Sequence, residues 1–317
     1  MSLKGLSARQ LSAPRSVCGN VPIDHGQHHQ RTAWTNLAEI GLARSVPLTT
    51  LREASTAAPF HRQKEAQNMS IAARRKPPNS LDEALGTRVE SLDWARVSSD
   101  LDAYGCASLG LLLTAGECQE LAGLYEDGGN FRSTIVMARH GLGRGEYKYF
   151  AYPLPAIIAA LRPALYEQLA PIANRWNESM GMAARYPPAH SDYIKRCHKA
   201  GQTRPTPLLL RYRENDYNCM HQDLYGEHVF PLQVVILLSE PGEDFTGGEF
   251  VLTEQRPRMQ SRAEVVPLRR GDAAVFAVHH RPVRGTRGTY RVNLRHGVSR
   301  LRSGHRSTAG IIFHDAR

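Results

Sequence analysis

The sequence HGVSRLRSGHRSTAGIIF occupies residues 296–313 and places a histidine ten residues before an arginine, directly ahead of the apolar strand Ser307–Phe313. The segments before it, from Leu208 on, are short, apolar and β-rich, and turns with glycine separate them. Many short strands with such turns are typical of a sandwich, a barrel or a jelly roll. We therefore expect residues 208–317 to form a β-rich core, with strands at Leu208–Tyr212, Val229–Leu238, Glu249–Thr253, Glu264–Leu268, Ala273–Val278, Arg291–Leu294 and Thr308–Phe313.

Residues 81–207 carry helical patterns instead. Thr114 and Glu117 have the spacing of a capping box, which predicts the start of a helix. Residues 155–180 place apolar side chains on one helical face, and Pro163 and Pro171 interrupt that face, so we expect two helices or a kink there. Helices followed by strands indicate an α+β protein in which N-terminal helices buttress the sheet.

The composition separates a tail from this domain. Hydrophobic residues make up 41% and charged residues 22% of the 317 residues, as in an ordinary globular protein. Residues 1–80 lack sustained periodicity, so we expect a disordered or targeting-like tail. The longest apolar runs have six residues, whereas a membrane span needs about 20. Five scattered cysteines without a CxxC pair indicate a reducing compartment, and we expect a cytoplasmic protein without a membrane partner.

The net charge of +10 is unevenly distributed along the chain. Residues 256–306 contain 13 arginines, no lysine and two acidic residues. Arginine binds phosphate in a bidentate manner, so this segment favours a phosphate-bearing partner, although the solvent face of surface strands could also account for it. Residues 139–153 interleave basic, aromatic and glycine residues, either as a mobile substrate-binding lid or as a loop packed on the core. The substrate contacts expected there are Arg144, Tyr147, Lys148 and Tyr149.

His221 and Asp223 are the first candidate metal ligands. Residues two apart on a strand point to the same face, so these side chains can chelate one ion. Chance alone gives about 0.5 His-x-Asp pairs in such a chain, so the pair carries little weight by itself. Imidazole and carboxylate suit ferrous iron when a second histidine completes a facial triad, and His296 can be that histidine. Arg306 can offer a bidentate guanidinium to a carboxylate.

This arrangement resembles the iron(II)- and 2-oxoglutarate-dependent dioxygenases. In their prolyl-hydroxylase-like branch the second half reads His-x-Val-x-x-hydrophobic-x-x-Gly-x-Arg, and the matching residues here are His296, Val298, Leu301, Gly304 and Arg306. The wider segment, from about residue 90 on, is similar to a bacterial oxygenase family predicted to oxidise damaged nucleic acid. The resemblance implies a double-stranded β-helix, which is a jelly roll of the cupin type.

The resemblance also implies the cofactors. Fe(II) would be bound by His221, Asp223 and His296, and 2-oxoglutarate by Arg306 with the hydroxyl of Tyr212; no catalytic residue beyond the metal site is expected. Dioxygen is the second cosubstrate, and ascorbate is a further candidate. An alternative stays open in which His280 is the third ligand and Arg291 the cosubstrate anchor. The valine, glycine and terminal-strand context favours His296 and Arg306.

The resemblance implies oxidative demethylation of alkylated nucleic acid. Single strands are the expected substrate, because a base inside a duplex must first be flipped out. Two alternatives remain, a protein (prolyl) or small-molecule hydroxylase and, from another class, a non-catalytic jelly-roll binding module.

Overall fold

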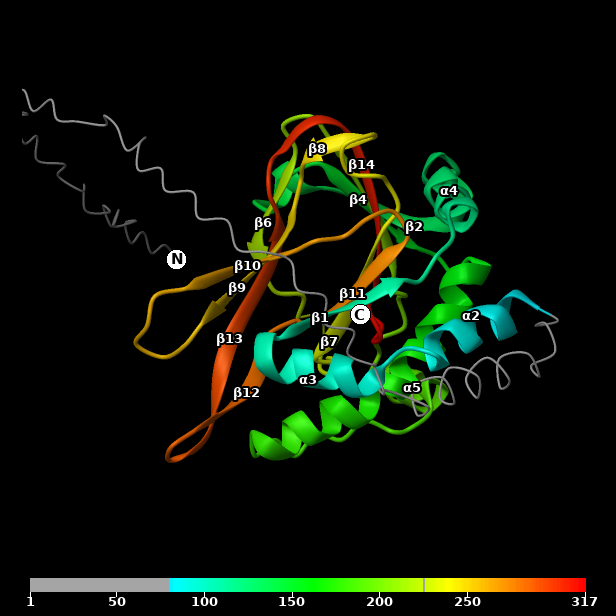
Figure 1. Cartoon of the computed structure of the whole chain (residues 1–317). Coiled ribbons are helices and arrows are strands. Elements are labelled where there is room, and N and C mark those ends of the chain that lie inside the picture. The colour runs from blue at the N-terminus through cyan, green and yellow to red at the C-terminus, as the bar shows by residue number, and fades with distance from the viewer. Residues whose placement is uncertain (1–79, 225) are drawn as a thin grey trace, which may run out of the picture. The chain divides into compact units, whose positions relative to one another are not determined.

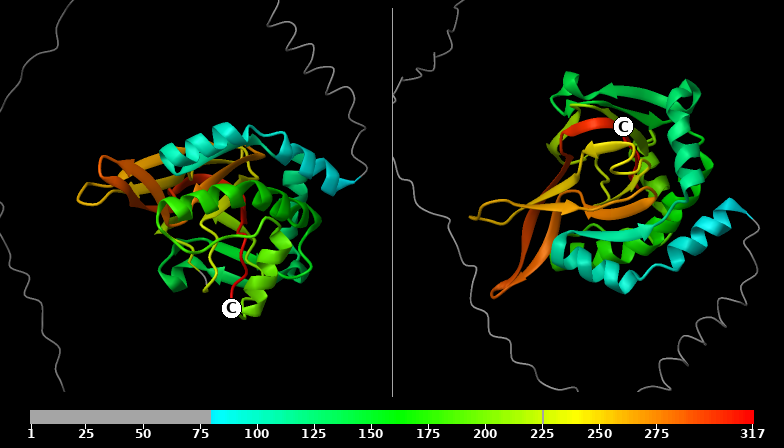
Figure 2. Two further views of the ribbon diagram at one scale, coloured as in Figure 1. Left: turned by 90° about the horizontal axis from the view of Figure 1, so that it is seen from below. Right: turned by 45° about the horizontal axis from the view of Figure 1, so that its top comes forward.

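The computed structural model describes residues 80–224 and 226–317 (Figure 1). The tail expected over residues 1–80 lies outside this part, apart from Ser80, which caps the first described helix. The described residues belong to one compact unit of two antiparallel sheets, with helices packed outside them (Figures 1 and 2).

The larger sheet has eight strands in the order β1-β11-β7-β14-β5-β4-β2, and β8 pairs with β14 at its side. These strands are β1 (Cys106–Leu111), β2 (Phe131–Val136), β4 (Glu146–Phe150), β5 (Leu208–Arg213), β7 (Leu232–Leu237), β8 (Phe245–Gly247), β11 (Asp272–Ala277) and β14 (Leu301–Ile311). Every residue of β7 is buried, which fits its place between two neighbouring strands in the middle of the sheet.

The smaller sheet has the order β10-β9-β13-β6-β3, and β12 pairs with β13 beyond the end of β6. Its strands are β3 (Gly143–Arg144), β6 (Tyr217–His221), β9 (Phe250–Gln255), β10 (Arg262–Val266), β12 (His280–Gly285) and β13 (Gly288–Val298). Residues of both sheets line one interior cavity, so the sheets face each other as the two halves of a jelly roll. The predicted α+β double-stranded β-helix is confirmed.

Among the described residues, five α-helices pack outside the sheets: α2 (Leu81–Glu90), α3 (Trp94–Tyr104), α4 (Ala115–Gly123), α5 (Ala156–Ser179) and α6 (His190–Lys199). Short 3-10 helices occupy Leu124–Glu126, Gly128–Asn130 and Met137–His140. The predicted capping box of α4 is present at Thr114 and Glu117. No helix of the described residues is long and apolar enough to cross a membrane.

Of the two alternatives expected for residues 155–180, two helices or a kink, the structure contradicts the first, because the single helix α5 covers Ala156–Ser179. It continues through both Pro163 and Pro171 over 24 residues. Each proline removes a backbone donor, but α5 buries 13 of its residues, and this packing stabilises the helix against those losses.

The first half of the domain is less helical than its sequence indicates. β1 pairs with β11, and β4 pairs with β5, so residues 81–207 contribute both outer parts of the larger sheet. The segment at 139–153, expected as a loop or lid, supplies β3 and β4. Residue 208 therefore begins a strand inside the sheet and is no boundary in the fold.

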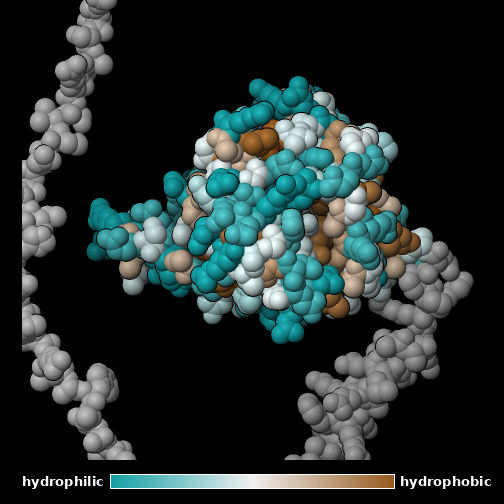
Figure 3. Space-filling view, turned by 90° about the horizontal axis from the view of Figure 1, so that it is seen from above, coloured by the Kyte–Doolittle hydropathy of each residue, from teal (hydrophilic) through white to brown (hydrophobic). Residues whose placement is uncertain are grey.

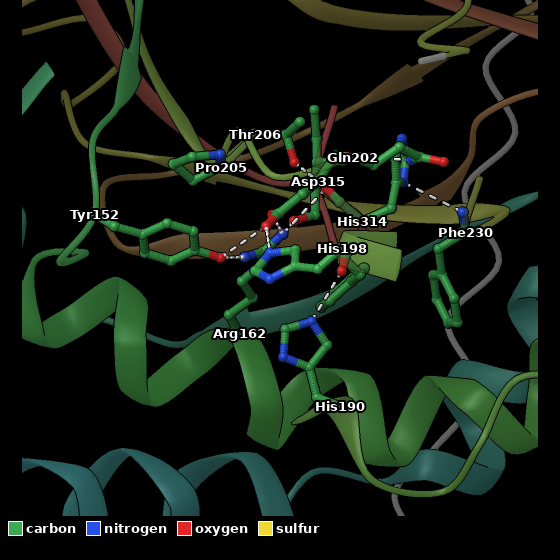
Figure 4. Close-up of polar contacts among 12 residues, drawn as sticks. Tyr152, Arg162, His190, His198, Gln202, Pro205, Thr206, Phe230, His314 and Asp315 are labelled. Atoms are coloured by element: carbon green, nitrogen blue, oxygen red, sulfur yellow. Dashed lines mark hydrogen bonds and ion pairs between the residues drawn. The ribbon is translucent and has the colours of Figure 1, made fainter. Parts of the chain in front are cut away.

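A buried ion pair ties the C-terminal end of the chain to α5 (Figure 4). Arg162 Nη2 lies 2.8 Å from Asp315 Oδ1, and Arg162 Nε donates to the carbonyl of Ile312 at 2.9 Å. Tyr152 Oη and His198 Nε2 contact the other carboxylate oxygen at 3.0 and 2.8 Å. Because the charges are paired and hydrogen-bonded, the cluster fixes the position of the chain directly after β14.

Candidate active site

The three predicted metal ligands, His221, Asp223 and His296, lie close together in the cavity between the two sheets. His221 is the last residue of β6 and lies opposite His296 of β13 in the register of the smaller sheet. The potential ligand atoms of His221, Asp223 and His296 all lie within 4.8 Å of one another. Asp223 Oδ1 is 3.4 Å from His221 Nε2, and Asp223 Oδ2 is 3.4 Å from His296 Nε2. This is the one such group of three in the described residues.

The surroundings of these side chains suit a divalent metal. His221 Nδ1 donates to the carbonyl of Cys219 at 2.8 Å, so Nε2 is the nitrogen that a metal could bind. Burial acts against the charge of His221, but the hydrogen bond to Asp223 outweighs it and raises the pKa of His221, so a metal would displace the proton that Nε2 directs at Asp223. Burial acts against the charge of Asp223, but hydrogen bonds from both histidines hold its pKa well below the usual range. Burial lowers the pKa of His296, which favours the neutral ring. An ionised carboxylate and neutral imidazoles are the forms that bind a metal.

A small cavity connects this group to Arg306. The cavity has a volume of about 70 Å³ and is lined by all three ligand candidates, by Tyr212 and by Arg306. By the usual allowance per water, this is room for roughly five water molecules. Arg306 lies on β14 of the larger sheet, opposite Tyr212 of β5, so it approaches across the barrel from His296.

Arg306 is a buried cation without a counterion. Its side chain is 2% exposed, and among the described residues no carboxylate lies within 4 Å of it. Its Nη1 donates to Thr308 Oγ1 at 2.6 Å, and its Nε has no partner. The carboxylate of Glu249 acts on Arg306 only from beyond 4 Å. Leaving a charge buried without a close partner is costly, so these surroundings favour the binding of an anion.

Unsatisfied polar atoms concentrate around the same cavity. Eight buried side-chain atoms of the described residues lack a hydrogen-bond partner, and five of these belong to residues that line the cavity. Buried polar groups in folded proteins are nearly always hydrogen-bonded, so this concentration indicates the place of a polar ligand. The five atoms are Tyr212 Oη, Asn218 Oδ1, Gln233 Nε2, His296 Nδ1 and Arg306 Nε.

The alternative ligand pair lies elsewhere. His280 begins β12, pairs with Asn293 and is not part of the three-residue group. Arg291 is exposed and donates to the carbonyl of Met180 at 3.0 Å. The geometry therefore favours His296 and Arg306.

The four expected substrate contacts divide into two pairs. Tyr147 and Tyr149 line the cavity, with their rings edge to face at 5.3 Å. Lys148 lies between them on the strand and therefore points to the opposite side, where its Nζ donates to the carbonyl of Tyr125 at 2.7 Å. Arg144 is exposed and lies 3.9 Å from Asp216. Lys148 and Arg144 are not cavity residues.

Three polar residues of the cavity were missed from sequence. Thr308 could have been found, because it lies two residues after Arg306 on the same face of β14. Gln233 is a lone amide in an otherwise apolar strand, which is a weak signal. Asn218 lies an odd number of residues before His221, and both line the cavity because the β6–β13 register shifts between them.

Solved structures that are similar to this chain include a prolyl-4-hydroxylase from Pseudomonas putida. It is 15% identical, with a TM-score of 0.43, and the match covers 71% of this chain and 99% of that chain. Another is an oxidoreductase of the 2OG-Fe(II) oxygenase family from Burkholderia pseudomallei, 16% identical with a TM-score of 0.41, which covers 71% and 94%.

Relatives in sequence are much closer. The uncharacterized proteins MT2286 and Rv2227 from two strains of Mycobacterium tuberculosis are each 53% identical over 188 residues, which is 58% of this chain and 81% of theirs. A family described as "Oxygenase, catalysing oxidative methylation of damaged DNA" matches residues 145–316. The match confirms the resemblance that the motifs indicated. Because the family consists of oxygenases, it also argues against the alternative of a non-catalytic binding module. The chain belongs to this oxygenase family and is an oxidoreductase.

Proposed function

We propose that the chain is an iron(II)- and 2-oxoglutarate-dependent oxygenase that acts on alkylated nucleic acid. The observation that carries the proposal is Arg306, a buried and unpaired cation that lines the same small cavity as His221, Asp223 and His296. The description of the family, which names damaged DNA, supports the substrate class.

The donor set fits ferrous iron. Two imidazoles and one carboxylate form the facial triad of non-heme iron oxygenases, and the remaining positions stay open for cosubstrates. When bound, iron would supply the activation of dioxygen that couples decarboxylation of 2-oxoglutarate to oxidation of a C–H bond. His221, Asp223 and His296 would hold it.

The remaining cavity residues fit a five-carbon dicarboxylate. Arg306 would bind one carboxylate in a bidentate manner, with Thr308 holding the guanidinium and Tyr212 offering its hydroxyl. The buried rings of Tyr147 and Tyr149 would exclude water from the cavity wall. The chain's own residues thus bind and orient the cosubstrate.

The overall reaction consumes 2-oxoglutarate and dioxygen and gives succinate, carbon dioxide and a hydroxylated substrate. On an N-methyl group the hydroxylated product is a hemiaminal, which loses formaldehyde and leaves the N–H.

The test has two stages. Anaerobic addition of Fe(II) and 2-oxoglutarate should give a charge-transfer absorption band, which Arg306→Gln should weaken at limiting 2-oxoglutarate. A panel of N-methylated single-stranded oligonucleotides should then release formaldehyde in proportion to succinate. If the band forms but no oligonucleotide increases succinate formation, the nucleic-acid substrate class is wrong and the hydroxylase reaction remains. If the band does not form, the whole proposal is wrong.

A further inference from the structure

Two long hairpins project from the barrel on one side (Figures 1 and 2). One is formed by β9 and β10, and the other by β12 and β13. His296 lies near the barrel end of β13, where it pairs with both His221 and Leu252. The tip of the second hairpin, at Gly288, is eight residues away, or about 27 Å at the usual rise of a strand. The hairpins therefore begin at the candidate metal group and lead outward from it.

Both hairpins carry a strong positive charge on their exposed side chains. Six exposed arginines lie on them: Arg258, Arg262, Arg284, Arg287, Arg291 and Arg295. The hairpins contain two acidic residues, and one of these, Glu254, is buried and contacts Arg281 and Arg256. Figure 3 shows the projecting part, on the left of that view, as mainly hydrophilic.

Most of these arginines have no counterion. In the described part of the chain, no carboxylate lies within 4 Å of Arg258, Arg284, Arg287 or Arg295. Arg270, in contrast, lies within 4.0 Å of three carboxylates outside the hairpins. An ordinary solvated face mixes both signs of charge, whereas the hairpins concentrate one sign next to the site.

Contacts hold the hairpins in place where they join the rest of the domain. Arg281 of β12 is 2% exposed and donates from Nε to Glu254 Oε2 of β9 at 3.0 Å. Its Nη1 donates to the carbonyl of Asp102 at the end of α3 at 2.8 Å. This buried pair joins both hairpins to the helical layer, so they present their charges at a fixed position relative to the site.

We infer that the two hairpins bind the phosphate backbone of a single-stranded nucleic acid and lead its target base to the cavity. The inference rests on the proposed function. Arginine suits this role because its planar fork contacts phosphate in a bidentate manner, and each neutralised phosphate adds to the salt dependence of binding.

The experiment compares two full-length triple variants with equal loss of charge. The hairpin variant is Arg258→Gln, Arg284→Gln, Arg287→Gln. The control variant is Arg269→Gln, Arg300→Gln, Arg302→Gln, which removes three exposed arginines of the same sequence segment that lie outside the hairpins, in the β10–β11 connection, in the β13–β14 connection and at the start of β14. Binding of an N-methylated single-stranded oligonucleotide is measured by fluorescence anisotropy over a salt series, and formaldehyde release is measured from the oligonucleotide and from the free N-methylated nucleoside.

We expect the hairpin variant to lower the slope of log K against log salt by about 2, since each lost phosphate contact is worth about 0.7. Its affinity at low salt should fall by at least about tenfold, while turnover of the nucleoside stays equal to that of the unaltered protein. The control variant should keep most of the slope.

Suppose that the unaltered protein binds and demethylates the oligonucleotide. If the hairpin variant and the control variant then lose binding and salt dependence equally, the inference is wrong and the proposed function remains. Loss of nucleoside turnover in the hairpin variant would also overturn it, because the site itself would then be disturbed. If the unaltered protein neither binds nor demethylates any oligonucleotide, the nucleic-acid function fails first, and the inference fails with it.

Discussion

The side-chain amide of Gln222 donates to Asn293 Oδ1 at 2.6 Å and to the carbonyl of Leu294 at the same distance. Gln222 stands between His221 and Asp223, and Asn293 lies three residues before His296 on β13. One side chain therefore ties the segment that bears two ligand candidates to the strand that bears the third. Such supporting contacts hold metal ligands in position in many sites.

Replacement of Gln222 by leucine should weaken Fe(II) binding by about tenfold to 100-fold, the usual effect of losing a supporting contact. Asn293→Leu should act similarly, and the double variant should be little worse than Gln222→Leu alone, because either single change already breaks the contact between Gln222 and Asn293. Anaerobic titration monitored by absorption measures the affinity. Asn293→Asp keeps the acceptor and should restore binding, and Gln260→Leu in the exposed β9–β10 turn serves as the control. Full additivity of the two leucine changes would contradict a shared positioning role.

The two histidine candidates for the third ligand can be separated directly. His296→Ala should abolish iron binding because the group would keep only one imidazole and one carboxylate. His280→Ala should leave iron content and succinate formation unchanged, since His280 lies outside the group. Metal analysis of both purified variants makes the comparison, and the opposite pattern would show that the assignment of His296 is wrong.

Arg306→Gln should raise KM for 2-oxoglutarate by about 100-fold, as expected when one partner of a buried charge pair is removed. Its melting temperature without cosubstrate should not fall, because the arginine is a buried charge without a counterion. Arg302→Gln, an exposed arginine on the same strand, should keep both values. A normal KM in Arg306→Gln would place the cosubstrate elsewhere.

Most of the strands from Leu208 on could be predicted because each is a short apolar segment with a turn beside it, but β6, β8 and β12 were not among the expected strands. Their observed bounds differ from the expected ones mainly at the ends, as in β13, which extends to residues 288–298 where Arg291–Leu294 was expected. The added residues 288–290 of β13 lie at the tip of the projecting hairpin and give no apolar signal. The ligand candidates could be predicted because strand alternation and the His-to-Arg spacing survive in the fold.

What could not be predicted depends on contacts between distant segments. β1 pairs with β11, more than 160 residues away, and β4 pairs with β5, 59 to 65 residues away, and these pairings make both segments strands. Helix α5 continues through two prolines because it packs against the rest of the domain. Asn218 reaches the cavity because of a register shift between two strands, which no local pattern encodes.

Gly304→Ala should destabilise the fold by about 3 kcal/mol through backbone strain and a steric clash. Gly304 has a φ of 80°, in the left-handed region, and a Cβ at this position would collide with the carbonyl of Asp244. Urea unfolding measures the loss. Gly86→Ala, where helix α2 leaves open space, should instead be neutral or stabilising. Equal stability of both variants would show that the glycine of the His-to-Arg motif has no conformational role.

His190 should make the stability of the folded protein sensitive to acid. Burial, with a smaller contribution from Arg162, lowers the pKa of His190 to about 4, and Asp315 opposes this shift only weakly. The unfolded chain, with a histidine pKa of about 6.5, takes up a proton that the folded protein does not accept, so stability is lost as pH falls from about 6.5 toward 4. Between pH 7 and 5 the loss from His190 alone should be about 2 kcal/mol.

His190→Gln tests this assignment. The amide of Gln can still donate to the carbonyl of Phe313, which His190 Nε2 contacts at 2.8 Å, but it does not titrate. The variant should therefore lose about 2 kcal/mol less stability than the unaltered protein between pH 7 and 5, as measured by urea unfolding at each pH. His305→Gln, on the exposed part of β14, is the matched control and should follow the unaltered protein. His314, whose pKa burial also lowers to about 4, should leave a residual pH dependence in the His190 variant. An unchanged pH dependence in His190→Gln would show that folding does not lower the pKa of His190.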